Sequence, residues 1–111
     1  NVETLLDKAD LVVDCFDNQQ SRLLVSGHCR AKQKPLVHAA LAADGSFGLV
    51  RWDGRFVADA EDQEGQATCE GGQHLPLIGL LGATLARSIQ DFVKSATERD
   101  FMVSLSGVNE T

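Results

Sequence analysis

Hydrophobic residues occur along the chain in short runs separated by polar and glycine-containing segments. The run Ala9–Phe16 is apolar and rich in β-branched residues, which is the pattern of a buried strand. Further strands are predicted at Leu36–Ala42, Ser46–Trp52 and Asp100–Leu105. The turn signal Ala43-Asp44-Gly45 separates the second strand from the third, so these two are expected to form an antiparallel hairpin.

Three other segments have helical patterns. They are Val2–Ala9, which resembles the last turns of a helix, Ser21–Lys32 and Leu77–Lys94. Asp17 and Asn18 offer capping chemistry before the second helix, and Pro76 opens the third where its missing N–H has no cost. The second helix is predicted to be amphipathic, with Leu23, Leu24 and Cys29 facing inward. The order of helices and strands predicts an α/β fold with a mixed parallel and antiparallel sheet.

The segment from Asp53 to Gly72 differs in composition from its surroundings. It contains six acidic residues against Arg55 alone, and four glycines, without sustained periodicity. A loop of about 20 residues is uncommon in a compact domain and is usually functional or mobile. A mobile crossover loop is therefore predicted at about 53–75.

Composition limits the possible functions. The 111 residues, 43% of them hydrophobic, suit one globular domain. A net charge of −6 argues against binding to nucleic-acid phosphates. No signal peptide or membrane-spanning run is visible, and the three cysteines share no C-x-x-C spacing. We expect a cytoplasmic protein with reduced thiols, no membrane association and no zinc site.

The most informative chemistry lies around Asp17. In open α/β sheets, ligands bind beyond the carboxyl ends of strands, and Asp17 follows such an end. A carboxylate in this position can hold Mg²⁺, and Arg22 could contact a phosphate or orient Asp17. A plain helix cap with a surface ion pair would produce the same residues, so both interpretations stay open.

Other polar and sulfur-containing residues are expected to be structural. Cys15 and Cys29 are predicted to pack in the core as small hydrophobes. His28 is placed on an exposed helix face and His38 in a strand, each with a structural or solvent role. Trp52 is expected to close the core rather than line a partner surface, and so is Phe56.

Three blocks along the chain resemble one family. They are Val12-Val13-Asp14-Cys15-Phe16-Asp17-Asn18 with Arg22; Lys34-Pro35-Leu36-Val37 with Ala39, Ala40 and Gly45; and Cys69-Glu70 with Pro76-Leu77-Ile78-Gly79-Leu80-Leu81-Gly82. The first resembles the D-x-x-D-N-x-x-x-R block of the ubiquitin-activating-enzyme-like family (the ThiF, MoeB and HesA group). The second is similar to its G-K-P-L-V segment, and the third to its crossover loop and following helix. The ordered set covers nearly the whole chain.

The resemblance implies ATP-dependent adenylation of the C-terminal glycine of a ubiquitin-like or sulfur-carrier protein. Asp17 then lies at the Mg–ATP or acyl-adenylate site, with Asn18 beside it and Arg22 in support. Cys69 matches a cysteine that forms thioester or persulfide-type adducts in some members, which makes it a candidate catalytic thiol. A loop cysteine without a role is the equal alternative.

Two departures from the family pattern shape this expectation. The region 54–68 lacks the cysteine pairs that bind a structural zinc in many members, so no zinc is expected. No G-x-G-x-x-G or Walker sequence occurs either, which indicates the C-terminal half of a Rossmann-like three-layer domain without its nucleotide-binding half. The helix Pro76–Ile89, with Gly79 and Gly82 on one face, is a candidate surface for a homodimer.

Two alternatives to an adenylating enzyme are considered. A non-catalytic binding or dimerisation module would keep the fold while lacking zinc cysteines and a nucleotide half. Half of an NAD-dependent Rossmann oxidoreductase is a further alternative, but the hairpin at Ala43–Gly45 and the D-N-x-x-x-R block argue against it.

We predict that residues 1–111 alone neither bind ATP tightly nor adenylate a carrier protein, because no phosphate-binding loop is among them. ATP–pyrophosphate exchange measured on the isolated chain should stay at background. Detectable exchange by these residues alone would contradict the prediction.

Overall fold

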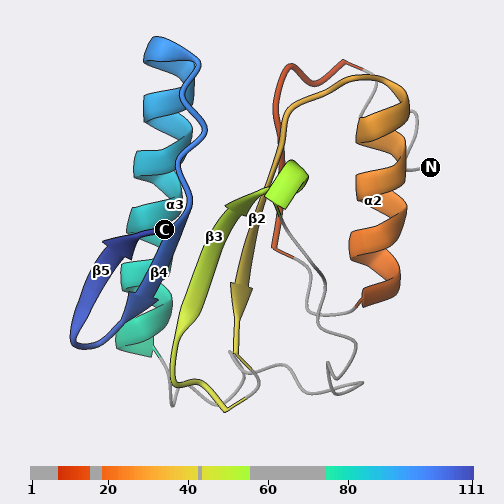
Figure 1. Ribbon diagram of the computed structural model, residues 1–111. Coiled ribbons are helices and arrows are strands. Elements are labelled where there is room, and N and C mark those ends of the chain that lie inside the picture. Colours follow the sequence, from red (N-terminus) through yellow and green to blue (C-terminus); the bar gives the residue numbers. More distant parts are fainter. Residues whose placement is uncertain (1–7, 16–18, 43, 56–74) are drawn as a thin grey trace.

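The computed structural model describes residues 8–15, 19–42, 44–55 and 75–111 (Figure 1). Its elements are β1 (Val12–Asp14), α2 (Gln19–Ala31), β2 (Leu36–Leu41), β3 (Gly48–Trp52), the short 3₁₀ helix η1 (Asp53–Arg55), α3 (Leu75–Ser95), β4 (Phe101–Ser104) and β5 (Gly107–Glu110). The α/β class predicted from the sequence is confirmed.

The strands form one mixed sheet in the order β1-β2-β3-β4-β5. Strand β1 runs parallel to β2, whereas each later pair is antiparallel. The predicted hairpin is therefore confirmed, with Val37 opposite Trp52 at one end and Leu41 opposite Gly48 at the other. The parallel register places Asp14 beside His38.

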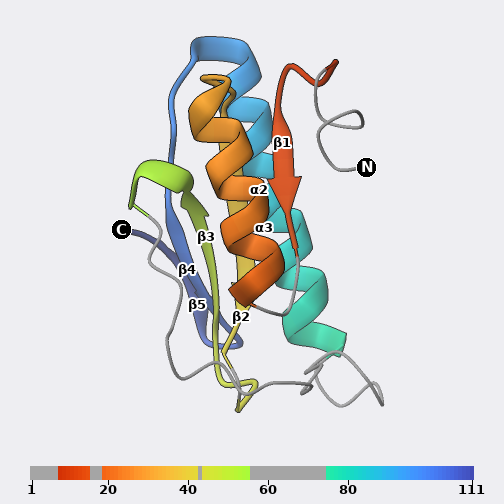
Figure 2. The ribbon, with the colours of Figure 1, turned by 90° about the vertical axis from the view of Figure 1, so that its right-hand side faces the viewer.

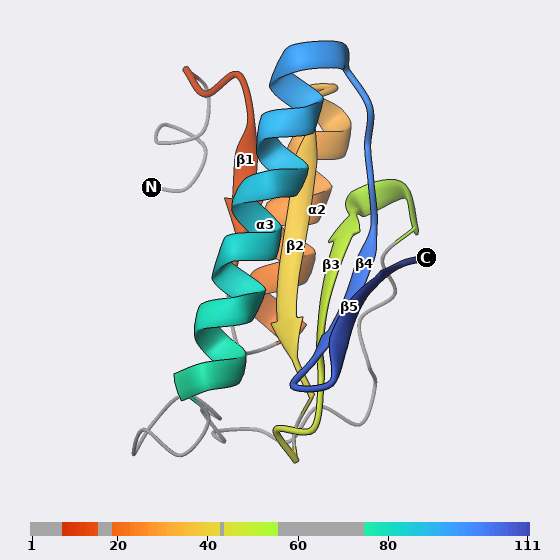
Figure 3. The ribbon, with the colours of Figure 1, turned by 90° about the vertical axis from the view of Figure 1, so that its left-hand side faces the viewer.

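The two helices cover opposite faces of the sheet (Figures 1, 2 and 3). On the α3 side the buried core consists of Val37, Val50, Trp52, Leu77, Leu81, Phe101 and Val103. On the α2 side a smaller cluster consists of Val12, Val25, Cys29 and Leu36. Helix, sheet and helix make the three layers of a Rossmann-like domain.

Trp52 anchors the larger core, as the sequence predicted. Its side chain is 1% exposed, and its ring lies 4.7 Å from that of Phe92 between centroids. The indole Nε1 donates to Ser88 Oγ at 2.9 Å, and Ser88 Oγ donates to the carbonyl of Arg99 at 2.7 Å. A polar pair thus satisfies the one polar atom of a large buried ring.

The inward face of α2 differs from the prediction. Leu23 and Leu24, expected to face inward, are 59% and 60% exposed. The buried residues of this helix are Arg22, Val25 and Cys29, spaced by three and four positions. The buried stripe of this helix begins with a charged residue. The positions of the apolar residues alone therefore indicate the wrong inward face.

Cys15 is exposed, so its prediction as a core residue is wrong, whereas the prediction for Cys29 is confirmed. The side chains of Val12 and Asp14 point toward α2. Because side chains alternate along a strand, those of Val13 and Cys15 point away from it. His28 is half-buried rather than on an exposed face.

Two further differences concern segment boundaries. Asp53–Arg55, assigned to the loop, forms η1, and the edge strand β5 was not predicted. Strand β5 is short, and no residue in it is fully buried, so it has no hydrophobic alternation to detect. Most of the helix predicted at Val2–Ala9 lies outside the described residues, and its last two residues, Lys8 and Ala9, are not helical. Phe56 and most of the predicted loop also lie outside the described residues.

We predict that Ser88→Ala lowers the free energy of unfolding by about 1–3 kcal/mol, because it leaves the buried Trp52 N–H without an acceptor. Urea unfolding followed by Trp52 fluorescence measures the change. Ser95→Ala is the matched control, since Ser95 is exposed in the last turn of the same helix, and should change stability by less than about 0.5 kcal/mol. Equal effects of the two substitutions would contradict this role for Ser88.

Candidate functional site

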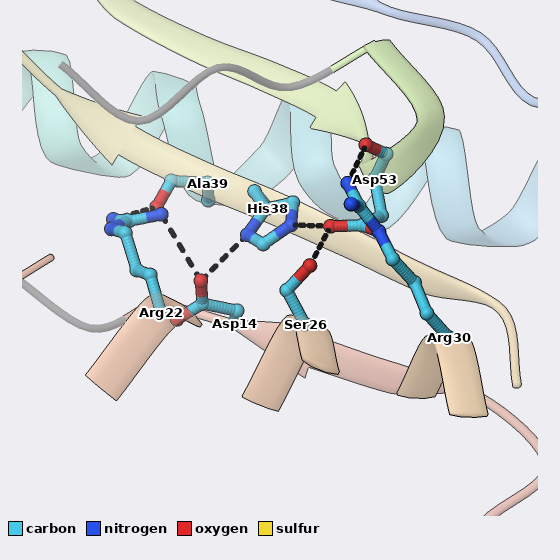
Figure 4. A network of polar contacts seen from close by, with 7 residues as sticks. All are labelled: Asp14, Arg22, Ser26, Arg30, His38, Ala39 and Asp53. Carbon is cyan, nitrogen blue, oxygen red and sulfur yellow. Dashed lines mark hydrogen bonds and ion pairs between the residues drawn. The ribbon is translucent and has the colours of Figure 1, made fainter. Parts of the chain in front are cut away.

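A network of polar side chains lies between α2 and the sheet (Figure 4). We call it the polar network; its side chains are Asp14, Arg22, Ser26, Arg30, His38 and Asp53. It crosses the face from the carboxyl end of β1 to η1. No comparable set of charged side chains lies in the core between the sheet and α3 among the described residues.

The network begins at a carboxylate with no solvent exposure. Asp14 is 0% exposed, and its Oδ2 accepts a hydrogen bond from Arg22 Nη1 at 3.2 Å. The same oxygen lies 2.6 Å from Nδ1 of His38, which is 1% exposed. Arg22 Nη2 donates to the carbonyl of Ala39 at 2.9 Å. A buried carboxylate without such partners would be strongly destabilising, so these contacts allow Asp14 to be buried at the carboxyl end of β1.

The network ends at Asp53. His38 Nε2 lies 2.7 Å from Asp53 Oδ1, which also accepts from Ser26 Oγ at 2.7 Å. Arg30 Nε donates to Oδ2 at 2.6 Å. Burial alone raises the pKa of Asp53, but the hydrogen bonds from His38, Arg30 and Ser26 and the charge of Arg30 outweigh it, so the pKa lies below its ordinary value. Asp53 is therefore a carboxylate at neutral pH.

Two periodicities bring these residues together. Arg22, Ser26 and Arg30 are four residues apart and so lie along one face of α2. Asp14 and His38 are register partners in the parallel pair β1–β2, so both side chains point to the same side of the sheet. One helix stripe and one register pair are thus enough to build the network.

Of the residues predicted to form the site, the structure describes Arg22 alone. Asp17, Asn18 and Cys69 lie outside the described residues. In the sequence, Asp17 and Asn18 fall between the end of β1 at Asp14 and the start of α2. Arg22 is 5% exposed, and its guanidinium is bound to Asp14 and to a backbone carbonyl. These contacts hold α2 against the sheet, and the predicted role of Arg22 beside Asp17 stays a prediction.

Sequence reasoning missed the connection between Asp14, His38 and Asp53. In the sequence, Asp14 falls in the strand predicted at Ala9–Phe16, His38 is expected to have a structural or solvent role, and Asp53 is the first of six acids in the predicted loop. One signal was available: an acidic residue inside a β-branched run needs a cationic partner if the strand is buried.

Two absences apply to the described residues only. Within 8–15, 19–42, 44–55 and 75–111, no three or more His, Cys, Asp or Glu side chains are arranged to hold a metal ion. In this same part of the chain, neither helix combines the length and apolar character that crossing a bilayer requires.

A model of the ThiF family matches residues 1–109. The chain belongs to the ThiF family. The polar network is thus a feature of a ThiF-family fold, and Asp14 and Arg22 lie in the block from which the resemblance was drawn. The five-stranded mixed sheet agrees with this assignment.

Curated relatives of this ThiF-family chain include three fungal proteins, each named adenylyltransferase and sulfurtransferase UBA4. The protein of Debaryomyces hansenii is 29% identical over 96% of this chain, which spans 27% of that relative. Those of Lodderomyces elongisporus and Pyricularia oryzae are 31% and 32% identical over 78% of the chain, which spans 21% of each. The chain therefore spans about a quarter of the length of the relatives it matches.

We predict that Asp53 stabilises the chain in a pH-dependent way. Its folded-state pKa lies below the unfolded value of about 3.9, so its contribution is complete above that value and is lost as the pH falls through the folded pKa. Asp53→Asn should lower the free energy of unfolding by about 1–3 kcal/mol at pH 7 and by progressively less between about pH 5 and 2.

Urea unfolding at a series of pH values measures the difference between the two proteins. Asp10→Asn is the matched control, because Asp10 is an exposed carboxylate outside the polar network, and its effect should be small throughout. A difference for Asp53→Asn that grows on acidification would contradict the assignment.

Proposed function

We propose that this ThiF-family chain forms the C-terminal half of an adenylating domain. In the full gene product, the domain would activate the C-terminal glycine of a ubiquitin-like or sulfur-carrier protein with ATP. The observation that carries the proposal is the family match over residues 1–109, supported by curated relatives whose names include adenylyltransferase. The mixed sheet and the buried Arg22 are consistent with it.

The proposed reaction joins the carrier carboxylate to the α-phosphorus of ATP. The carboxylate oxygen forms the new bond, the bond to the β-phosphate oxygen breaks, and pyrophosphate leaves with that electron pair. Mg²⁺, when bound, would neutralise phosphate charge during this transfer. This chain would provide Asp17 as the metal-binding carboxylate, with Asn18 beside it.

The positions of β1 and α2 are compatible with a metal-binding role for Asp17. Asp17 lies in sequence between β1, whose carboxyl end faces the ligand edge of the sheet, and α2. The first turn of α2 offers backbone N–H groups and the positive end of the helix dipole, which favour a phosphate. Arg22 and Asp14 fix β1 against α2 on either side of this connection. Their task would be to hold the connection still rather than to touch ATP.

Cys69 is proposed as the acceptor thiol for a second step. Its thiolate would attack the carbonyl carbon of the acyl-adenylate, and AMP would leave with the electron pair of the broken bond. A thioester to the carrier would result.

A second copy of the protein is the proposed partner of α3. Gly79 and Gly82 are exposed, and a Cβ built on either would meet no atom within 4 Å. The helix therefore has room for another backbone to approach closely.

We predict that Asp17→Ala in the full gene product lowers carrier-dependent ATP–pyrophosphate exchange by about 100-fold or more, since several kcal/mol of charge stabilisation would be lost. The assay uses a ubiquitin-like protein ending in glycine and measures label exchange between pyrophosphate and ATP. Asp10→Ala is the control, an exposed acid outside the site, and should retain wild-type exchange.

The carrier itself provides a second control. Removing its terminal glycine should abolish exchange by the wild-type protein, because the reacting carboxylate is then displaced. Wild-type exchange by Asp17→Ala would contradict the assignment of that residue. No exchange by the wild-type protein with any carrier tested would favour a non-catalytic module.

A further inference from the structure

His38 has a contact pattern that a neutral imidazole cannot satisfy with two ionised carboxylates. Nδ1 lies 2.6 Å from Asp14 Oδ2, and Nε2 lies 2.7 Å from Asp53 Oδ1. A neutral imidazole has one N–H and one lone pair, and a carboxylate has only acceptors. Each of the two short contacts needs a proton between the nitrogen and the oxygen. A neutral ring between two carboxylates has only one such proton, so the three groups together must hold a second.

The surrounding charges place that proton on the ring. Arg22 pairs with Asp14, and Arg30 pairs with Asp53, so each carboxylate is held in its ionised form. With His38 as an imidazolium, charges alternate along the network: Arg22 positive, Asp14 negative, His38 positive, Asp53 negative, Arg30 positive. Each charge along the network then lies against one of opposite sign.

We propose that His38 is a positioning residue for adenylation: as an imidazolium it fixes the Asp14 carboxylate and, through it, the guanidinium of Arg22. The proposal rests on the proposed function of the chain. It assigns to His38 no contact with ATP or with the carrier.

The shared oxygen explains why Arg22 depends on His38. Asp14 Oδ2 receives both Arg22 Nη1, at 3.2 Å, and the His38 ring, at the shorter distance of 2.6 Å. The shorter contact sets the position of that oxygen. If His38 lost its Nδ1–H, its lone pair would oppose the carboxylate, and Asp14 would move with the arginine that it binds.

Charged and titratable groups reach His38 from each element around it. Asp14 lies on β1, Arg22 and Arg30 on α2, and Asp53 on η1. Arg51 on β3 is the register partner of His38 and shares its side of the sheet. The positive charge of Arg51 disfavours the imidazolium, whereas the two carboxylates in direct contact favour it. Loss of the proton on Nδ1 of His38 would therefore disturb Arg22.

Two substitutions separate the two halves of the His38 contact. The amide nitrogen of asparagine occupies roughly the place of Nδ1, so His38→Asn can still donate to Asp14 while leaving Asp53. The amide nitrogen of glutamine reaches roughly the place of Nε2, so His38→Gln can donate to Asp53 while leaving Asp14. Both amides are neutral and have a single donor nitrogen, so they differ mainly in which carboxylate is held.

The test measures carrier-dependent ATP–pyrophosphate exchange by the full gene product. His38→Gln should lower kcat by about 10- to 100-fold, as expected for a misplaced supporting group, whereas His38→Asn should stay close to the wild-type rate. Ser88→Ala, which weakens the opposite face of the sheet, controls for stability and should leave kcat unchanged.

Nitrogen-15 NMR of the histidine rings gives a readout independent of activity. Both His38 ring nitrogens should carry protons in the wild-type protein at neutral pH. A neutral ring there, or equal exchange rates for His38→Gln and His38→Asn, would overturn the positioning role while leaving the proposed function intact. An absence of exchange by the wild-type protein would instead overturn the proposed function and, with it, this role for His38.

Discussion

The side chain of Asp14 imposes the constraint on which the arrangement around α2 depends. A carboxylate with no solvent exposure within a strand needs charge-assisted partners, and here they are Arg22 and His38. Meeting that need ties β1 to α2 through an ion pair and to β2 through the register. His38 then extends the contact to Asp53, where η1 begins. One buried charge thereby connects four elements.

The two faces of the sheet have different physical characters as a result. The α3 side is an apolar core around Trp52, whose single polar atom is satisfied by Ser88. The α2 side combines a small apolar cluster with the polar network. Packing on the α3 side provides stability, whereas directional contacts on the α2 side hold particular atoms in place. A reaction at the carboxyl end of β1, next to α2, is consistent with this difference between the two faces.

Much of the fold could be predicted from local pattern. The runs that became β2 and β3, the turn between them and the helix after Pro76 have strong signals that later packing did not override. The predictions were wrong where the burial of a residue depended on a partner distant in the sequence. Leu23 and Leu24 are apolar yet exposed, because the sheet offers α2 a carboxylate at Asp14 and so selects the face that carries Arg22.

The site was predictable only in part, for a similar reason. Asp17 and Arg22 were predicted from a block of neighbouring residues, and the role of Asp17 stays a prediction because that residue lies outside the described ones. The His38–Asp53 contact joins residues 15 positions apart through a hairpin register, and Asp14 lies 24 positions before His38. Neither contact can be predicted from the spacing of these residues in the sequence. Predicting them requires the order of strands in the sheet and the face that α2 covers.

A crystal structure of the full gene product with ATP and Mg²⁺ would show directly whether the nucleotide binds beside the Asp14–Arg22 pair. We expect the metal at the Asp17 carboxylate, with Arg22 bound to Asp14 and His38 bridging Asp14 and Asp53. Nucleotide bound away from the β1–α2 connection, or Arg22 released from Asp14 to contact a phosphate, would contradict this expectation.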